Sequence, residues 1–472
     1  MYFILFAIII LWVVYVYLKI RVNDQAYLEM NERDWHIHLL PSPSLFVRLF
    51  NVMVGRTGAT ILVTLLEKTA IRSALNKSLK QMVEAEASGN VPSVLCDAEA
   101  QATMRTRLAR QADDIRASTT MTPFAKVSTY AGSLLHLANH TGLLKLGMAA
   151  HAEQVREPVF IVSMPRTGTT ILHRTMATDT SRFRTFDMAD MVQPLPPLPR
   201  SDRLARNTLA KKAQKVLVDP LKKLFPGWVE CLETMHAMVP DQVDEDIGWY
   251  DSGLGMGFVE SQMFLYREHK RRDFPLQDRD LATYRYAWLD MVMRIYQTLE
   301  PESNKPWLMK DPFHTAFLPQ LLQQFPDAKL IFMHRPPEDV LASMAKLFLC
   351  FTCIGIIPGA KGTESAVWGQ NVLDKVTLFL AGIVEFSKST QMDKNRRIDF
   401  QFSIFAPNII TSIEQIYEAF FNQRPSEAAI SVMQSYLDDH DREKKGNQPR
   451  SLADFHLTRA DVAFEEYRDT FL

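Results

Sequence analysis

A short stretch in the first half of the chain has the residue types of an anion-binding loop. It reads PVFIVSMPRTGTTILHRTM over residues 158–176 and passes from a predicted strand through a tight turn into a predicted helix. Gly168 allows the backbone to bend toward an anion, and the N–H groups and hydroxyls of Thr169 and Thr170 would then point at it from the helix N-terminus. Arg166 adds a planar guanidinium that suits a charged oxygen. The stretch predicts a phosphate-binding loop.

The same stretch departs from the loop of magnesium-dependent nucleotide hydrolases. That loop requires G-x-x-x-x-G-K-[ST], whereas Gly168 is followed by threonine and Ser163 stands where the first glycine belongs. A P-loop kinase is therefore disfavoured. Taken alone, the loop is also compatible with a strand–turn–helix that binds nothing.

A second stretch, KLIFMHRPPEDVLASMAKLF, repeats the passage from strand to helix. Arg335 ends its strand, and Ser343 follows eight residues later on the predicted helix. An arginine and a serine at this spacing could hold one phosphate from two sides.

Together, PRTGTT and HRPPEDVLAS resemble the sulfotransferase family that uses 3′-phosphoadenylyl sulfate (PAPS) as sulfuryl donor. In that family the first motif holds the 5′-phosphosulfate of the donor, and the arginine and serine bind its 3′-phosphate. The resemblance implies a P-loop-like α/β fold, PAPS as co-substrate and no metal. It implies these donor-binding residues: Arg166, Thr167, Gly168, Thr169, Thr170, Arg335 and Ser343.

Two further stretches resemble the same family. Lys310, in WLMKDPFHTAFLPQLLQQFPDAKLIFMHR, would stand beside the transferred sulfuryl group. Near the C-terminus, DREKKGNQPRSLADFHLT resembles the last donor-binding stretch and offers Lys445 and Gly446, with Lys444 and Arg450 as further candidates. This last match is partial, because the fuller Arg-Lys-Gly-x-x-Gly pattern is absent.

Sulfuryl transfer to an alcohol needs a base for the acceptor hydroxyl and cations for the charge that develops on oxygen. Arg166 and Lys310 suit the second role. His236, which precedes an acidic run in MHAMVPDQVDEDIGWYDS, resembles the family histidine and is the predicted base. His314 and Asp187 are the alternatives. His173, behind the loop, is expected to be structural.

The acceptor is the least defined part of the prediction. Apolar segments at 347–359 and 377–386 could line a pocket for a lipophilic alcohol, or they could be ordinary core. A sugar or tyrosyl acceptor stays open. Besides a membrane-anchored sulfotransferase, two alternatives remain: a P-loop nucleotide-dependent kinase, and a non-catalytic, membrane-tethered nucleotide-binding protein.

The elements that position these residues alternate between short apolar runs and helical stretches. Residues 158–164, 306–311 and 329–335 are predicted to be buried strands. This alternation indicates an α/β domain over 151–472, in which a parallel sheet is flanked by helices. Residues 21–150 are expected to form a helical juxtamembrane region.

The N-terminus predicts a membrane anchor over residues 1–20. The run MYFILFAIIILWVVYVYL carries no charged side chain, and at ~1.5 Å per residue it reaches about 27 Å, close to a bilayer core. Lys19, Arg21 and Arg33 after the run favour a cytoplasmic body. Sequons at Asn76 and Asn139 favour a Golgi or endoplasmic-reticulum lumenal body instead. A second apolar segment, LFVRLFNVMVGRTGATILVTLLEK, could lie along the membrane surface, but a core helix is favoured.

The composition excludes some classes of protein. The formal net charge is −1, which argues against a nucleic-acid partner. Four cysteines are too few and too scattered for a disulfide framework. Cys350 and Cys353 form a lone C-x-x-C inside an apolar run and are interpreted as buried core residues.

Overall fold

The structure is a computed structural model of the chain. It describes residues 43–150, 154–233, 235–254, 279–300, 304–357, 360, 364–389, 392–393, 395–443, 451–462 and 464–472. The predicted anchor at 1–20 and the candidates Lys444, Lys445, Gly446 and Arg450 lie outside these residues. Those predictions therefore stay predictions.

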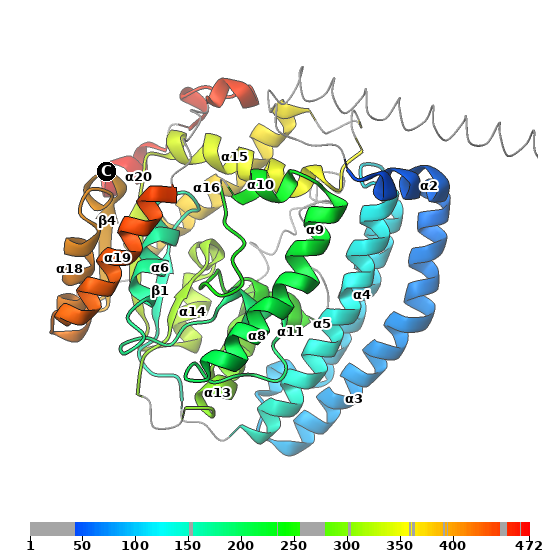
Figure 1. Ribbon diagram of the computed structural model, residues 1–472, viewed down its shortest axis with the longest axis horizontal. Helices are drawn as coiled ribbons and strands as arrows, with labels where there is room; N and C mark the ends of the chain where they lie inside the picture. The colour runs from blue at the N-terminus through cyan, green and yellow to red at the C-terminus, as the bar shows by residue number, and fades with distance from the viewer. Residues whose placement is uncertain are drawn as a thin grey trace, which may run out of the picture.

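Four parallel strands form the central sheet (Figure 1). Their order is β2-β1-β3-β4, and their bounds are β1 Val159–Val162, β2 Leu308–Lys310, β3 Lys329–His334 and β4 Arg397–Gln401. Val159 pairs with Leu308 on one side and with Lys329 on the other. The predicted α/β class and its three strands are confirmed. The edge strand β4 was not predicted.

Alternate residues of the strands supply two separate cores. Phe160 and Val162 of β1 face one core, whereas Val159 and Ile161 face the other. Both faces are covered, which explains why β1 and β3 are continuous apolar runs rather than alternating ones.

Different helices cover the two faces. The Phe160 side packs against residues from α13 Arg279–Gln297, α14 Leu318–Gln324, α15 Pro337–Cys353 and α16 Ser365–Ser389. The Val159 side packs against residues from α6 Thr169–Ala177, α18 Ile409–Phe421 and α19 Glu427–Glu443. Two short helices, α17 Phe402–Phe405 and α20 Glu465–Phe471, follow β4 and end the chain respectively.

Four helices at the N-terminal end form a bundle beside the sheet domain, on the right in Figure 1. They are α2 Leu45–Leu66, α3 Arg72–Ser88, α4 Ala98–Ala117 and α5 Pro123–Ala149, and a π-helical turn at Glu67–Ile71 joins α2 to α3. The helical prediction for this region agrees with what is seen over 43–150. The core-helix interpretation of the apolar segment holds for one side only: Val47, Ala59 and Val63 of α2 are buried against the body, and the other side is exposed.

Short helices lie between β1 and β2 and lead the chain past the loop. They are α7 Met188–Val192, α8 Arg203–Ala213, α9 Asp219–Leu224, α10 Trp228–Glu233 and α11 Gly248–Leu254. Single 3-10 or π turns complete the connections at 93–95, 214–218, 312–316, 452–455 and 460–462. The segment between α10 and α11 carries His236 and the acidic run. The N–H of Asp246 in this run donates to the carbonyl of Lys310, the last residue of β2, which places the run at the end of the sheet.

Candidate active site

The loop after β1 has an unusual backbone that only some residues tolerate. Arg166 and Gly168 both have positive φ, 68° and 91°, and α6 begins at the next residue. A Cβ on Gly168 would lie 3.0 Å from the ring of Phe402, so glycine is required there by conformation and by space. The hydroxyl of Thr167 donates to the carbonyl of Met164 at 2.8 Å and closes the turn.

Arg166, Arg335 and Ser343 converge across this loop. The Nε of Arg166 donates to the Ser343 hydroxyl at 2.9 Å, and the Nη1 of Arg335 donates to the Arg166 carbonyl at 2.9 Å. Burial lowers the pKa of Arg166, and the neighbouring Arg335 guanidinium lowers it further. The lowered pKa of Arg166 shows that two positive charges lie close enough to repel each other, which is the electrostatic character of an anion site.

Arg335 has unused hydrogen-bonding capacity in this arrangement. Its Nε is buried and has no hydrogen-bond partner within the described residues, although Asp339 lies 3.7 Å away as an ion pair. Its guanidinium carbon lies 4.6 Å from the centroid of the Phe402 ring. The side chain is therefore oriented by an aromatic surface while a donor is left over for a charged ligand.

Lys310 ends β2 on the other side of the loop. Its side chain is only 3% exposed, and its Nζ donates to the Thr170 hydroxyl at 3.1 Å and pairs with Glu245. Because β1 and β2 are parallel neighbours, the end of β2 lies next to the loop that follows β1. A buried cation is thereby fixed beside the start of α6.

Three consecutive acidic residues each take a different basic partner. Asp244 lies 3.6 Å from Nε2 of His236, and Glu245 pairs with Lys310. Asp246 contacts Nε2 of His314 at 3.1 Å, and its backbone N–H donates to the Lys310 carbonyl at 3.2 Å. The run holds His236 and Lys310 on the same side of the sheet end.

The Asp246 contacts continue into a buried network beneath the site. Arg285, on α13, pairs with both Asp246 and Asp311, and the hydroxyl of Tyr286 lies 3.0 Å from Nδ1 of His314. Burial raises the pKa of Asp246, but the charges of His314 and Arg285 outweigh it, so its pKa is lowered to about 2. This network fixes the position of the acidic run from below.

His236 lies at the edge of the site with one-fifth of its side chain exposed. Burial lowers its pKa, but the Asp244 carboxylate more than compensates, so the net pKa is raised. The carbonyl of the preceding Met235 accepts a hydrogen bond from Arg166 Nη1 at 2.7 Å. The predicted base and the predicted loop are therefore physically linked, and the Phe351 ring packs 5.9 Å from the imidazole.

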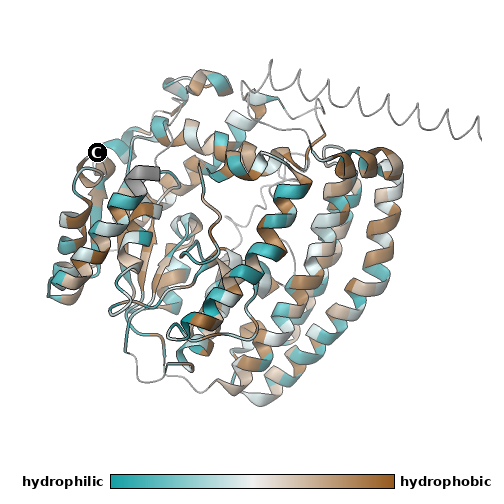
Figure 2. Cartoon of the chain, in the orientation of Figure 1, coloured by the Kyte–Doolittle hydropathy of each residue, from teal (hydrophilic) through white to brown (hydrophobic). Residues whose placement is uncertain are grey.

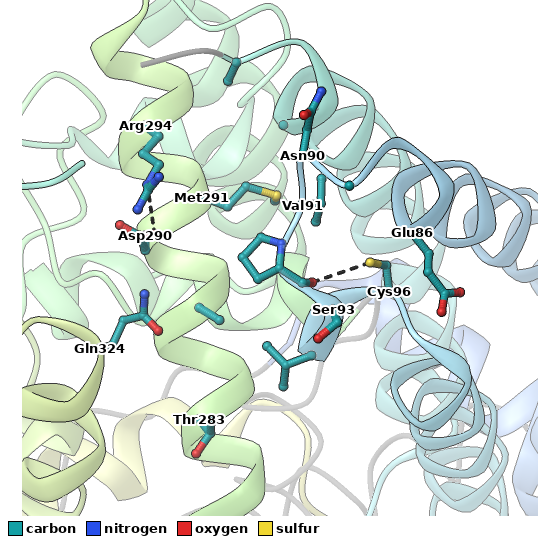
Figure 3. Close-up of a pocket in the computed structure, with 16 residues that line it drawn as sticks. Glu86, Asn90, Val91, Ser93, Cys96, Thr283, Asp290, Met291, Arg294 and Gln324 are labelled. Carbon is teal, nitrogen blue, oxygen red and sulfur yellow. Dashed lines mark hydrogen bonds and ion pairs between the residues drawn. The ribbon is translucent and has the colours of Figure 1, made fainter. Parts of the chain in front are cut away.

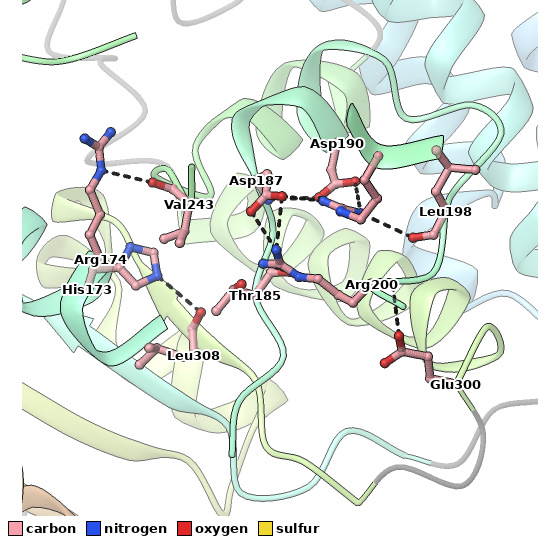
Figure 4. Close-up of polar contacts among 11 residues, drawn as sticks. His173, Arg174, Thr185, Asp187, Asp190, Leu198, Arg200, Val243, Glu300 and Leu308 are labelled. Carbon is pink, nitrogen blue, oxygen red and sulfur yellow. Dashed lines mark hydrogen bonds and ion pairs between the residues drawn. The ribbon is translucent and has the colours of Figure 1, made fainter. Parts of the chain in front are cut away.

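The alternative bases have other structural partners, and Figure 4 shows those of Asp187, with Arg200 among them. Asp187 caps α7, and Arg200 and Arg206 engage its carboxylate. His314 is fully buried against Asp246. His173 lies under the sheet against the Leu308 carbonyl, and burial lowers its pKa to about 3.

The two apolar segments mostly supply core. Buried residues within 347–353 and 377–386 belong to the large core on the Phe160 side of the sheet. Cys350 and Cys353 are buried free thiols, as expected for core residues. Phe351 lies in the first of these segments and contacts the site, because its ring packs against the imidazole of His236.

Sequence reasoning missed several residues that shape the site. Glu245 and Asp244 were noted only as part of an acidic run, and they prove to pair with Lys310 and His236. Several acidic residues in a row were themselves a signal that basic partners lie nearby. Phe402 follows an unpredicted strand, and Arg285 lies far along the chain, so neither had a local signal. Arg174 also fixes the segment that carries His236, because its guanidinium donates to the carbonyl of Ala237 at 3.1 Å.

A separate pocket of about 560 Å³ lies between α13 and the α3–α4 connection (Figure 3). The Asp290–Arg294 ion pair, 2.9 Å long, and Cys96 are among the residues that line it. None of the loop, strand-end or acidic-run residues lines this pocket. Among the described residues, no group of three or more His, Cys, Asp or Glu side chains could hold a metal ion.

Comparisons with known proteins agree with this geometry. The structure is similar to that of sulfotransferase STF9 from Mycobacterium avium, with a TM-score of 0.64 and 20% identity, covering 84% of this chain and 96% of that one. Sulfotransferase STF1 from Mycobacterium tuberculosis H37Rv is similar at a TM-score of 0.61 and 18% identity, covering 83% and 98%. The comparison with curated proteins found no match. Residues 158–421, which contain the loop, Lys310, Arg335 and Ser343, match the Sulfotransferase family, and the chain therefore belongs to that family.

Proposed function

We propose that the protein is a membrane-anchored sulfotransferase that moves the sulfuryl group of PAPS to the hydroxyl of a lipophilic alcohol. The observation that carries the proposal is the convergence of two guanidinium groups, Arg166 and Arg335, with Ser343 beside a helix N-terminus. These groups are all hydrogen-bond donors or cations, as a phosphosulfate and a second phosphate require. The kinase alternative receives no support from the family match or from the two solved structures.

The fit to the donor can be judged from this chain's own residues. The leftover Nε of Arg335 and the hydroxyl of Ser343 would hold the 3′-phosphate, as the family resemblance implies. Residues 166–170 would hold the 5′-phosphosulfate at the start of α6. Arg166 now spans both regions, so it would exchange its contact with Ser343 for contacts with the donor.

His236 and Lys310 would supply the chemistry. Asp244 lies beside Nε2 of His236, so Nδ1 would take the proton from the acceptor hydroxyl. As the acceptor oxygen bonds to sulfur, the bond from sulfur to the 5′-phosphate oxygen breaks, and adenosine 3′,5′-bisphosphate leaves. Lys310 and Arg166 would stabilise the charge on the oxygens during this step.

The attachment to the membrane rests on the apolar run at the N-terminus. A cytoplasmic body is supported by the basic residues after that run. Of the two sequons, Asn139 is buried within α5 and so is a poor glycosylation acceptor in the folded protein, whereas Asn76 is exposed on α3. A bilayer-anchored enzyme would meet acceptors that partition into lipid, which favours a lipophilic alcohol over a sugar.

A transfer assay tests the proposal. The full chain in detergent micelles is incubated with PAPS that carries a radiolabelled sulfuryl group. Three acceptor preparations are compared: a lipid extract rich in alcohols, a set of glycans, and a set of tyrosyl peptides. We expect labelled lipid product, and we expect Arg166→Ala to abolish it. A wild-type protein that binds adenosine 3′,5′-bisphosphate but labels no acceptor class would favour the non-catalytic binding protein, and a preference for Mg-ATP over the bisphosphate would favour the kinase.

A further inference from the structure

The outer face of α2 exposes large apolar side chains that the fold leaves uncovered. The exposed fractions are 57% for Leu45, 60% for Phe46, 58% for Met53, 55% for Ile61 and 52% for Leu65. Figure 2 shows α2 as a mainly hydrophobic helix at the outer edge of the bundle. Single exposed apolar residues are ordinary, but five on one helix indicate a contact surface.

The opposite side of α2 is fixed to the body of the protein. Val47, Ala59 and Val63 are buried, and the side chain of Asn51 accepts a hydrogen bond from the N–H of Phe124 at 2.8 Å. The N–H of Ser44, at its start, donates to the Leu224 carbonyl at 2.8 Å. By length and composition, Leu45–Ser88 is the one helix among the described residues that could cross a membrane. These contacts place α2 on the body, where it cannot span a bilayer without unpacking.

The charges around α2 fit an anionic lipid surface. No acidic residue occurs from 35 to 66, whereas Arg48 and Arg56 lie within the helix, Arg48 half-buried and Arg56 exposed. Lys223, exposed at the end of α9, precedes the residue that accepts the hydrogen bond from Ser44. Apolar side chains with cations nearby are typical of helices that lie in the membrane interface.

The length of chain between the predicted anchor and α2 also favours a lipid surface as the contact of α2. The uncharged apolar run ends at Leu18, and α2 begins at Leu45. The 26 residues between them can extend at most about 90 Å, so the proposed span would tether α2 within reach of the bilayer surface. A bend at Gly55, where φ is 59°, divides α2 into two parts. A flat surface can therefore contact the first part, which carries Leu45, Phe46 and Met53, while the second part, with Ile61 and Leu65, turns along the bundle.

We propose that the exposed face of the first part of α2, before Gly55, rests on the lipid surface as a second membrane contact that orients the body. This adds to the proposed N-terminal anchor and does not depend on sulfuryl transfer. The start of α2 is bonded to the end of α9, and α10 and the His236 segment follow directly. The contact would therefore hold the base end of the site close to the bilayer, where a lipophilic acceptor resides.

Spin labelling of the full chain tests this contact. All four native cysteines are buried, so a cysteine introduced at Phe46 can be labelled selectively. The labelled protein is reconstituted into vesicles of phosphatidylcholine and phosphatidylglycerol, and its accessibility to oxygen and to a water-soluble nickel chelate is measured. Val432 on α19 is 51% exposed and serves as the matched control for an exposed apolar position.

We expect the Phe46→Cys label to be accessible to oxygen and shielded from the chelate, and the Val432→Cys label to behave as in water. A Phe46 label as accessible to the chelate as the Val432 label would overturn the proposal. So would a label shielded from both reagents, because another protein segment or a second copy would then cover α2. Protein that fails to float with the vesicles would overturn both the anchor and the α2 contact.

Discussion

Replacing Arg335 by alanine should selectively weaken the binding of a 3′-phosphate. A hydrogen bond to a charged group contributes about 1.5 to 3 kcal/mol. Arg335 could offer two such bonds, but its side chain is 27% exposed, and solvent weakens the interaction. We therefore expect a loss of about 3 kcal/mol, which is about 100-fold in Kd at 1.4 kcal/mol per tenfold change.

Calorimetric titration with two nucleotides separates this role from a structural one. Arg335 also donates to the Arg166 carbonyl, so its loss could disturb the loop as well. Adenosine 3′,5′-bisphosphate should bind about 100-fold more weakly to Arg335→Ala, whereas adenosine 5′-monophosphate, which lacks the 3′-phosphate, should bind almost as it does to wild type. Arg424→Ala, at a 71% exposed position, is the control and should change neither. Equal losses for both nucleotides would refute the assignment of Arg335 to the 3′-phosphate.

Four further predictions concern the chemistry and the loop. Replacing His236 by alanine should lower kcat by about 100- to 10,000-fold. In wild type, kcat/KM should rise as the pH passes the raised pKa of His236, because the base must be neutral. Asp244→Asn should move this inflection to lower pH, because it removes the carboxylate that stabilises the imidazolium. Lys310→Met should reduce kcat by about 100- to 1,000-fold with little change in donor Kd, since the lysine acts on charge that develops in the transition state. Gly168→Ala should weaken donor binding at least ~10-fold, because its left-handed conformation costs an L-residue about 1 to 2 kcal/mol and its Cβ would press on Phe402.

Contradicting outcomes can be stated for the pH profile that tests the base, for the lysine and for the loop glycine. An Asp244→Asn profile with an unchanged or higher inflection would mean that another group is the base. A Lys310→Met protein with normal kcat and weakened donor binding would assign the lysine to binding rather than to catalysis. Normal donor affinity in Gly168→Ala would show that the loop does not contact the donor.

The sheet could be predicted where strands are buried on both faces. The strands β1 and β3 are continuous apolar runs, and both were found from the sequence. The strand β4, Arg397–Gln401, lies at the edge with only Phe400 buried, and the charged residues Arg397 and Asp399 hide its pattern. For the α2 segment a core helix was favoured over a helix on the membrane surface, and the structure buries one side of it. Apolar composition alone does not show which side of a helix its neighbours will cover.

The site could be predicted where its parts are local in sequence. The loop and the Arg335–Ser343 pair each lie at a single strand-to-helix junction, and the parallel sheet then brings the two junctions together. The partners of the acidic run could not be read from the sequence, because Glu245 reaches Lys310 across 65 positions. The contact of Phe402 with the loop depends on the placement of β4, which was itself missed.

An experimental structure of the full chain with adenosine 3′,5′-bisphosphate, prepared without magnesium, is the most direct test of the two-pocket arrangement. One phosphate should lie against Arg335 and Ser343 and the other against residues 166–170, with Arg166 released from Ser343. A nucleotide bound elsewhere, or one whose 3′-phosphate points away from Arg335 into solvent, would show that the two strand-to-helix junctions do not hold a single donor.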